Sequence, residues 1–206
     1  MGRSQGVRLL LVGFVLLVGL GIALATGAVR AGKPAPAPTT PPPPLLGTAK
    51  GGVFSGSGVT FHYPPTWRTL PQPASPVQGP GPLGRIVLGS GTGTDRVLVE
   101  AFRLATPITD STKTVFLAQV SQEVSAFASA ENGSLRSKVT ATTLGSLPAY
   151  TARAEWPGPG GVTMTGRFYF AYQGYAVYEV SCQRATTASA EIDAGCRQIV
   201  TTFRTA

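Results

Sequence analysis

The chain has 206 residues, of which 13% are charged, and its formal net charge is +8. Five of the 17 basic residues precede Gly51, whereas all nine acidic residues follow it, so the charge from Gly51 onward is +3. The basic residues of this part are scattered, without runs of Lys and Arg or interleaved aromatic residues. That distribution is typical of a solvated surface and argues against nucleic acid as a partner.

The first element is an uncharged apolar run, Leu9–Val29. About 20 apolar residues in a helix cross a bilayer core, so residues 1–30 are predicted to form a cytoplasmic tip and a transmembrane signal anchor. Arg3 and Arg8 before the run favour a cytoplasmic N-terminus, which places the rest of the chain outside the cytoplasm. A signal peptide cleaved after Ala25 is the alternative, and it would give a secreted protein.

Residues 31–50 form a proline-rich segment that includes four consecutive prolines, Pro41–Pro44. Proline fixes φ and has no N–H to donate, so this segment is predicted to be a semi-rigid polyproline II linker. Residues 51–206 are enough for one domain with its own core, and we expect this domain to lie outside the cytoplasm.

The domain is predicted to contain seven strands and two helices. The first helix begins near Asp110–Thr112, which are good N-cap residues, and ends at Asn132–Gly133; the second spans about 187–203. The strands show alternating or continuous apolar residues bounded by Gly and Pro: 59–63, 85–88, 96–104, 138–144, 148–156, 162–172 and 175–182. This order predicts an α+β fold with an antiparallel sheet flanked by helices, an α/β/α sandwich.

Two cysteines, Cys182 and Cys196, lie in the exported domain. Cys196 shares a helix face with Ile192, Ile199 and Phe203, so it is expected to point toward the sheet that carries Cys182. We therefore predict a structural disulfide, with two reduced buried thiols as the alternative. Because no histidine or further cysteine completes a ligand set, no metal or cofactor is predicted.

Acid–base catalysis would have to use His62, the single histidine, or a pair of carboxylates. His62 is predicted to be a surface residue of a strand. Glu100, Glu155 and Glu179 lie in predicted strands, and we expect them to project outward. No catalytic residue is assigned on these grounds, and the chain is predicted not to be an enzyme.

Aromatic residues gather near the last hairpin. Alternation places Phe168, Phe170 and Tyr172 on one side of a strand and Tyr169 on the other. One side is predicted to be core and the other an exposed strip that binds a partner. Tyr169, Tyr175 and His62 are accordingly the candidate binding residues.

The segment Gly58–Trp67 resembles the opening of the PsbP-like fold, a glycine and an apolar strand followed by Tyr-Pro-x-x-Trp. Leu144–Tyr150 is similar to a later strand entry of that family, and the hairpin at Gly174 and the helix ending at Phe203 fit its layout. The resemblance covers most of 51–206. The family includes actinobacterial membrane-anchored or secreted envelope proteins. It implies a sheet flanked by helices that serves as an adaptor or accessory subunit.

These observations favour a non-enzymatic, membrane-tethered binding or accessory domain of a bacterial cell envelope. The membrane is contacted through residues 9–29, and the expected partner is an envelope protein. Two alternatives are a carrier of a small apolar ligand, with a pocket between sheet and helix, and a hydrolase that uses His62.

Overall fold

The computed structural model describes residues 47–71, 83–91, 94–186 and 190–206. The predicted signal anchor and most of the predicted linker lie outside these ranges. Within them, no helix is long and apolar enough to cross a membrane. The first strand, β1 (Thr48–Lys50), falls at the end of the predicted linker, so the ordered fold begins before Gly51.

An antiparallel sheet of eight strands forms the centre of the fold. Its order is β4-β5-β6-β11-β10-β9-β7, and β8 pairs with β9. A positive φ of 57° at Gly174 permits the tight turn between β10 and β11, the last two strands of the sheet along the chain. The strands are β4 (Arg68–Thr69), β5 (Gly84–Gly89), β6 (Arg96–Arg103), β7 (Ser134–Leu135), β8 (Thr140–Leu144), β9 (Leu147–Pro157), β10 (Thr163–Gln173) and β11 (Ala176–Ala185).

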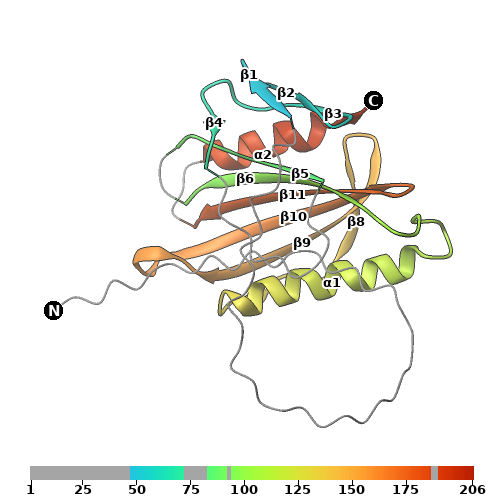
Figure 1. The fold of residues 1–206 in the computed structure, drawn as a ribbon. Coiled ribbons are helices and arrows are strands. Elements are labelled where there is room, and N and C mark those ends of the chain that lie inside the picture. Colours follow the sequence, from blue (N-terminus) through green and yellow to red (C-terminus); the bar gives the residue numbers. More distant parts are fainter. Residues whose placement is uncertain (1–46, 72–82, 92–93, 187–189) are drawn as a thin grey trace, which may run out of the picture.

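Helix α1 (Lys113–Ala130) covers one face of this sheet (Figure 1). Its buried stripe recurs every four residues at Phe116, Val120, Val124 and Ala128. These side chains belong to one apolar cluster with aromatic residues of β9 and β10, namely Trp156, Phe168 and Phe170. The predicted alternation along β10 is therefore confirmed.

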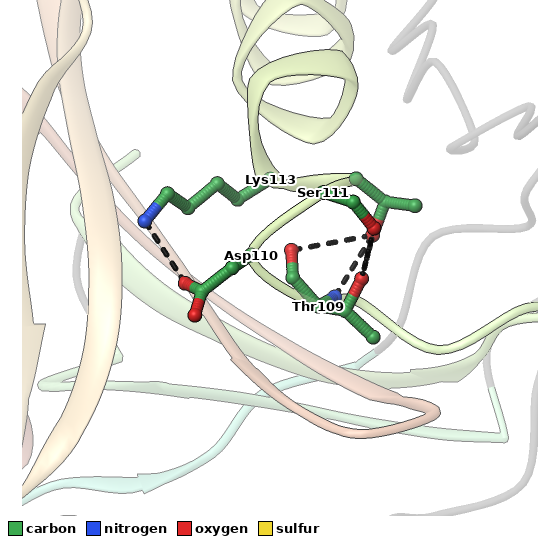
Figure 2. A network of polar contacts seen from close by, with 5 residues as sticks. Thr109, Asp110, Ser111 and Lys113 are labelled. Atoms are coloured by element: carbon green, nitrogen blue, oxygen red, sulfur yellow. Dashed lines mark hydrogen bonds and ion pairs between the residues drawn. The ribbon is translucent and has the colours of Figure 1, made fainter.

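The start of α1 is organised by a threonine-rich turn (Figure 2). Thr112 occupies the N-cap position but makes no side-chain cap; its hydroxyl instead accepts the backbone N–H of Thr109 at 2.8 Å. The Thr109 hydroxyl lies 2.9 Å from that of Ser111, and Lys113 pairs with Asp110 at 3.0 Å. This exposed polar cluster stabilises the loop before the helix, so its contacts have a structural explanation.

Helix α2 (Ala190–Thr202) covers the opposite face, between the large sheet and a second sheet of four strands (Figure 1). The second sheet contains β1, β2 (Val53–Gly56), β3 (Val59–His62) and β12 (Arg204–Thr205). The α+β class is confirmed, and the small sheet adds a layer that was not predicted. Its Phe61 stacks on Phe203, which follows α2, with ring centroids 5.9 Å apart.

Close contacts fix both ends of α2. A Cβ at Gly195 would overlap the ring of Trp67, whose indole N–H donates to Glu191 Oε1 at 2.9 Å. At the other end, Gly145 has φ 59°, and its N–H donates to the carbonyl of Val200 at 2.7 Å. The β8–β9 turn thereby satisfies a carbonyl in the last turn of the helix.

Candidate functional site

An open groove of about 630 Å³ lies against the large sheet beside α2. Its lining comes from β9, β10, β11, α2 and the segment that follows β7. Successive side chains of a strand alternate between faces, so Thr165, Arg167 and Tyr169 of β10 share the face that carries α2. The groove is therefore open on the side of the sheet opposite α1.

Arginine is the commonest residue type in the groove. Five arginines line it together with two acidic residues: Arg136, Arg153, Arg167, Arg184, Arg197, Glu155 and Asp193. Each acid is already used, because Arg136 binds Glu155 at 2.7 Å and Arg184 binds Asp193 at 3.0 Å. Among the described residues, the other three arginines form no ion pair, so the groove carries an uncompensated charge of +3.

Two of these three arginines face each other across neighbouring strands. Arg153 of β9 and Arg167 of β10 are register partners, and both are exposed. Like charges directly opposite each other in an antiparallel pair destabilise the sheet. An oxyanion between the two guanidinium groups would turn this repulsion into attraction, since arginine binds carboxylate and phosphate with two parallel hydrogen bonds.

Tyr169 holds one of these cations in place. The Arg167 guanidinium lies 5.2 Å from the centroid of the Tyr169 ring, a cation–π geometry. Burial raises the pKa of Tyr169 above its usual range, and the charge of Arg167 partly opposes the rise. Tyr169 is 5% exposed, so its ring is largely covered, and the Arg167 guanidinium packs against it.

The predicted disulfide between Cys182 and Cys196 is confirmed, and both cysteines line the groove. The bond ties β11 to α2 with Cα atoms 6.0 Å apart. Arg197 directly follows Cys196, so the bond fixes the position of the helix that carries this arginine. A disulfide is typical of proteins outside the cytoplasm.

The other candidate binding residues lie elsewhere. His62 is exposed on the small sheet, and its backbone N–H donates to the Thr202 hydroxyl at 2.8 Å. Within the described ranges its imidazole has no hydrogen bond or ion pair that could assist catalysis. Tyr175 is 48% exposed at the β10–β11 turn, beside Arg103. The expected exposed aromatic strip is not formed, because Tyr169 and Tyr178 are buried.

The opposite face of the sheet carries a cluster of carboxylates under α1. Glu100 of β6 and Glu179 of β11 are register partners, and Glu123 of α1 lines the same small hollow. Glu100 is 4% exposed and binds the buried Arg85 at 2.6 Å. The expectation that Glu100 and Glu179 project outward is wrong, because their strand positions face the helix.

Enclosure changes the acidity of this cluster. Burial raises the pKa of Glu123 to about 7, and the charge of Glu100 adds to the rise. Burial also raises the pKa of Glu179 well above its usual range, with Glu100 and Glu123 adding to the effect and Arg85 opposing it. Among the described residues, no group of three or more His, Cys, Asp or Glu side chains is arranged to hold a metal ion.

The hollow beside these carboxylates is small. Its volume of about 20 Å³ is that of a single water molecule, and polar side chains make up much of its lining. Ligand pockets are typically more than ten times larger and mostly apolar. This space between sheet and helix therefore does not suit the apolar ligand of a carrier.

Sequence reasoning missed the groove because its arginines are far apart along the chain. The signal that could have found part of it is the glycine-rich turn around Gly160, which joins β9 to β10. Arg153 and Arg167 are equidistant from Gly160, so a hairpin centred there places them opposite each other. Arg197 could be added only through the disulfide at the preceding residue.

Comparison with known proteins establishes no family for this chain. No family model matches it, and no curated protein matches its sequence. Among solved structures, a Bacteroides thetaiotaomicron protein has a TM-score of 0.50 and 11% identity over 79% of this chain. The matched region spans 49% of that protein, so the chain corresponds to about half of its length.

A second structure is LpqN of Mycobacterium tuberculosis, described as involved in cell envelope biogenesis. It has a TM-score of 0.47 and 16% identity, with 72% of this chain and 83% of LpqN covered. At these identities the comparisons concern the fold alone. The PsbP-like resemblance thus stays a prediction.

Proposed function

We propose that this chain is a membrane-tethered, non-enzymatic binding domain of a bacterial cell envelope, and that it binds an anionic ligand in the arginine-lined groove. The observation that carries the proposal is the set of three arginines without carboxylate partners, Arg153, Arg167 and Arg197, around one hollow. Guanidinium groups stay protonated at any physiological pH, so the groove attracts anions under all such conditions.

The tether is supported by the apolar run 9–29 and the proline-rich segment after it. An extracytoplasmic position is supported by the disulfide, which oxidising compartments preserve. A proline-rich spacer would hold the groove away from the bilayer, within reach of other envelope components.

Binding is tested by calorimetric titration of the full chain in neutral detergent with inorganic phosphate, galacturonate, polygalacturonate and poly(glycerol phosphate). We expect at least one of these anions to bind, and the double variant Arg153→Gln/Arg167→Gln to lose the binding. The matched control Arg68→Gln/Arg103→Gln removes the same charge from exposed positions outside the groove and should bind as the wild type does. Binding of none of the anions, or equal loss in both variants, would refute the anion site.

The tether is tested by fractionating cells that express the full chain. Retention in alkali-washed membranes, together with digestion of the domain by protease added outside the cytoplasmic membrane, is the expected result. Recovery of a soluble form that begins after Ala25 would show cleavage and contradict the tether.

A further inference from the structure

The uncompensated arginines belong to three different elements around the groove, namely β9, β10 and α2. Arg153 is in β9 and Arg167 is its partner in β10. Arg167 is in turn the register partner of Cys182 in β11, whose disulfide leads to Cys196, the neighbour of Arg197. The cations are therefore arranged in a row that runs across the strands.

The row is longer than a single oxyanion. Neighbouring strands are about 4.8 Å apart, so the path from β9 over β10 and β11 to α2 exceeds about 10 Å. One carboxylate or phosphate can bridge Arg153 and Arg167, but it leaves Arg197 unmatched. At the β7 end the row continues to Arg136, whose backbone N–H donates to the carbonyl of Arg153 at 2.7 Å. A ligand with several negative charges at intervals matches this arrangement.

The remaining lining is neutral and hydrogen-bonding. Thr165 and Thr186 line the groove between and beside the arginines, and their hydroxyls can both donate and accept. Such groups suit the hydroxyls of a sugar or polyol between charged groups. Stacking of Arg167 on Tyr169 orders its guanidinium before the ligand arrives, which lowers the entropic cost of binding.

Two other polyanions fit less well. A lipid surface calls for apolar side chains that insert among the acyl chains. The exposed large hydrophobic residues of the described ranges do not line the groove; they are Val53, Leu83, Val115 and Tyr175. Single-stranded nucleic acid binds by stacking bases on open aromatic rings, whereas Tyr169 is covered.

We infer that the groove binds a linear polyanion made of sugar or polyol units with repeated carboxylate or phosphate groups, laid across β9, β10 and β11 toward α2. This inference rests on the proposed function and specifies its ligand. A chain that engages the arginines in sequence gains affinity with length, because each further contact becomes intramolecular.

The test is a chain-length series on the full chain in neutral detergent. Galacturonate is compared with its dimer, tetramer and hexamer, and glycerol phosphate with poly(glycerol phosphate). We expect the dissociation constant to fall by at least about tenfold from monomer to tetramer and then to level off as the row is filled. The series that binds with the lower dissociation constant identifies carboxylate or phosphate as the charged group. Either result supports the inference.

Salt dependence supplies a second readout. For the galacturonate tetramer, we measure the slope of log affinity against log salt concentration. Each of the variants Arg153→Gln, Arg167→Gln and Arg197→Gln should reduce the magnitude of this slope by about one. The control Arg103→Gln should leave the slope unchanged. Equal slopes in groove and control variants would overturn the inference.

Two further outcomes separate this inference from the proposed function. If the monomers bind as tightly as the tetramer and the groove variants lose both, the linear polyanion is excluded while the anion site stands. If vesicles of phosphatidylglycerol bind through the groove and the oligomers do not, the ligand is a lipid and the inference fails. Absence of binding to any anion overturns both.

Discussion

The two faces of the large sheet each carry an Arg–Glu pair of similar length in opposite surroundings. Arg85 and Glu100 lie 2.6 Å apart and are almost fully buried, whereas Arg136 and Glu155 lie 2.7 Å apart at the open groove. The closed face has surplus carboxylates, and enclosure raises their pKa. The open face has surplus arginines, which stay charged in contact with solvent. The enclosed carboxylates thus tend to hold protons, whereas the exposed arginines stay charged and available to a ligand.

The largest expected effect comes from removing the enclosed cation. Arg85→Ala should lower the free energy of unfolding by about 3–5 kcal/mol, since it leaves Glu100 buried without its guanidinium. Urea unfolding of the full chain measures the loss. The control Arg136→Ala breaks the exposed pair with Glu155 and should cost less than about 1 kcal/mol. Equal losses would contradict the contrast between the faces.

Removal of the disulfide should lower both the stability of the fold and the anion affinity of the groove. Cys182→Ser/Cys196→Ser opens a loop with a sequence separation of 14 and should cost about 3 kcal/mol of stability. Because the bond fixes the helix that carries Arg197, anion affinity should fall as well. Unfolding curves and calorimetric titrations, with and without reductant, measure both effects. A stable variant with unchanged anion affinity would show that the bond does not organise the groove.

The enclosed face should make stability depend on pH. Folded Glu123 keeps its proton up to about pH 7, whereas the unfolded chain releases it near pH 4.5. Stability is therefore highest below the lower value and falls as the pH rises through this window, by about 2 kcal/mol after allowance for the partial exposure of Glu123.

Glu123→Gln should flatten this pH profile, and thermal unfolding between pH 4 and about pH 8 measures the change. Asp110→Asn is the control, since Asp110 is exposed beside the start of α1. A profile that is equally steep in Glu123→Gln and wild type would mean that Glu100 and Glu179, which face Glu123, carry the dependence instead.

The smallest expected effect has the opposite sign. Arg153→Gln removes one of two like charges that face each other across β9 and β10, so stability should rise by up to about 1 kcal/mol. The same variant should bind anions less tightly. A gain in stability together with a loss of affinity would show that Arg153 serves binding at a cost in stability, and a loss of both would mean that Arg153 contributes to packing.

Local patterns were sufficient to predict most elements. The Gln173–Gly174 turn predicted the final hairpin because a tight turn needs a residue that tolerates positive φ. The spacing of Ile192, Cys196 and Ile199 predicted the buried face of α2, and the disulfide followed from it. These features depend on residues close together in sequence, which is why the chain alone revealed them.

Features that depend on distant pairing were missed. The small sheet needs Arg204 beside Thr60, and neither segment shows a pattern that specifies the other. The enclosed cluster needs Glu100 opposite Glu179, although charged residues in strands are ordinarily exposed. The groove likewise appears only when the register between β9, β10 and β11 is known.

The contact between the β8–β9 turn and α2 bears on how fast the chain folds. Gly145 donates to Val200, so the last turn of the helix is completed by a residue from a remote hairpin. We therefore expect the last turn of α2 to be completed only once the β8–β9 hairpin has formed. Folds dominated by such remote pairings reach the native state in milliseconds to seconds, orders of magnitude slower than helical bundles. We expect refolding of this domain to belong to the slow class, with the C-terminal helix docking late.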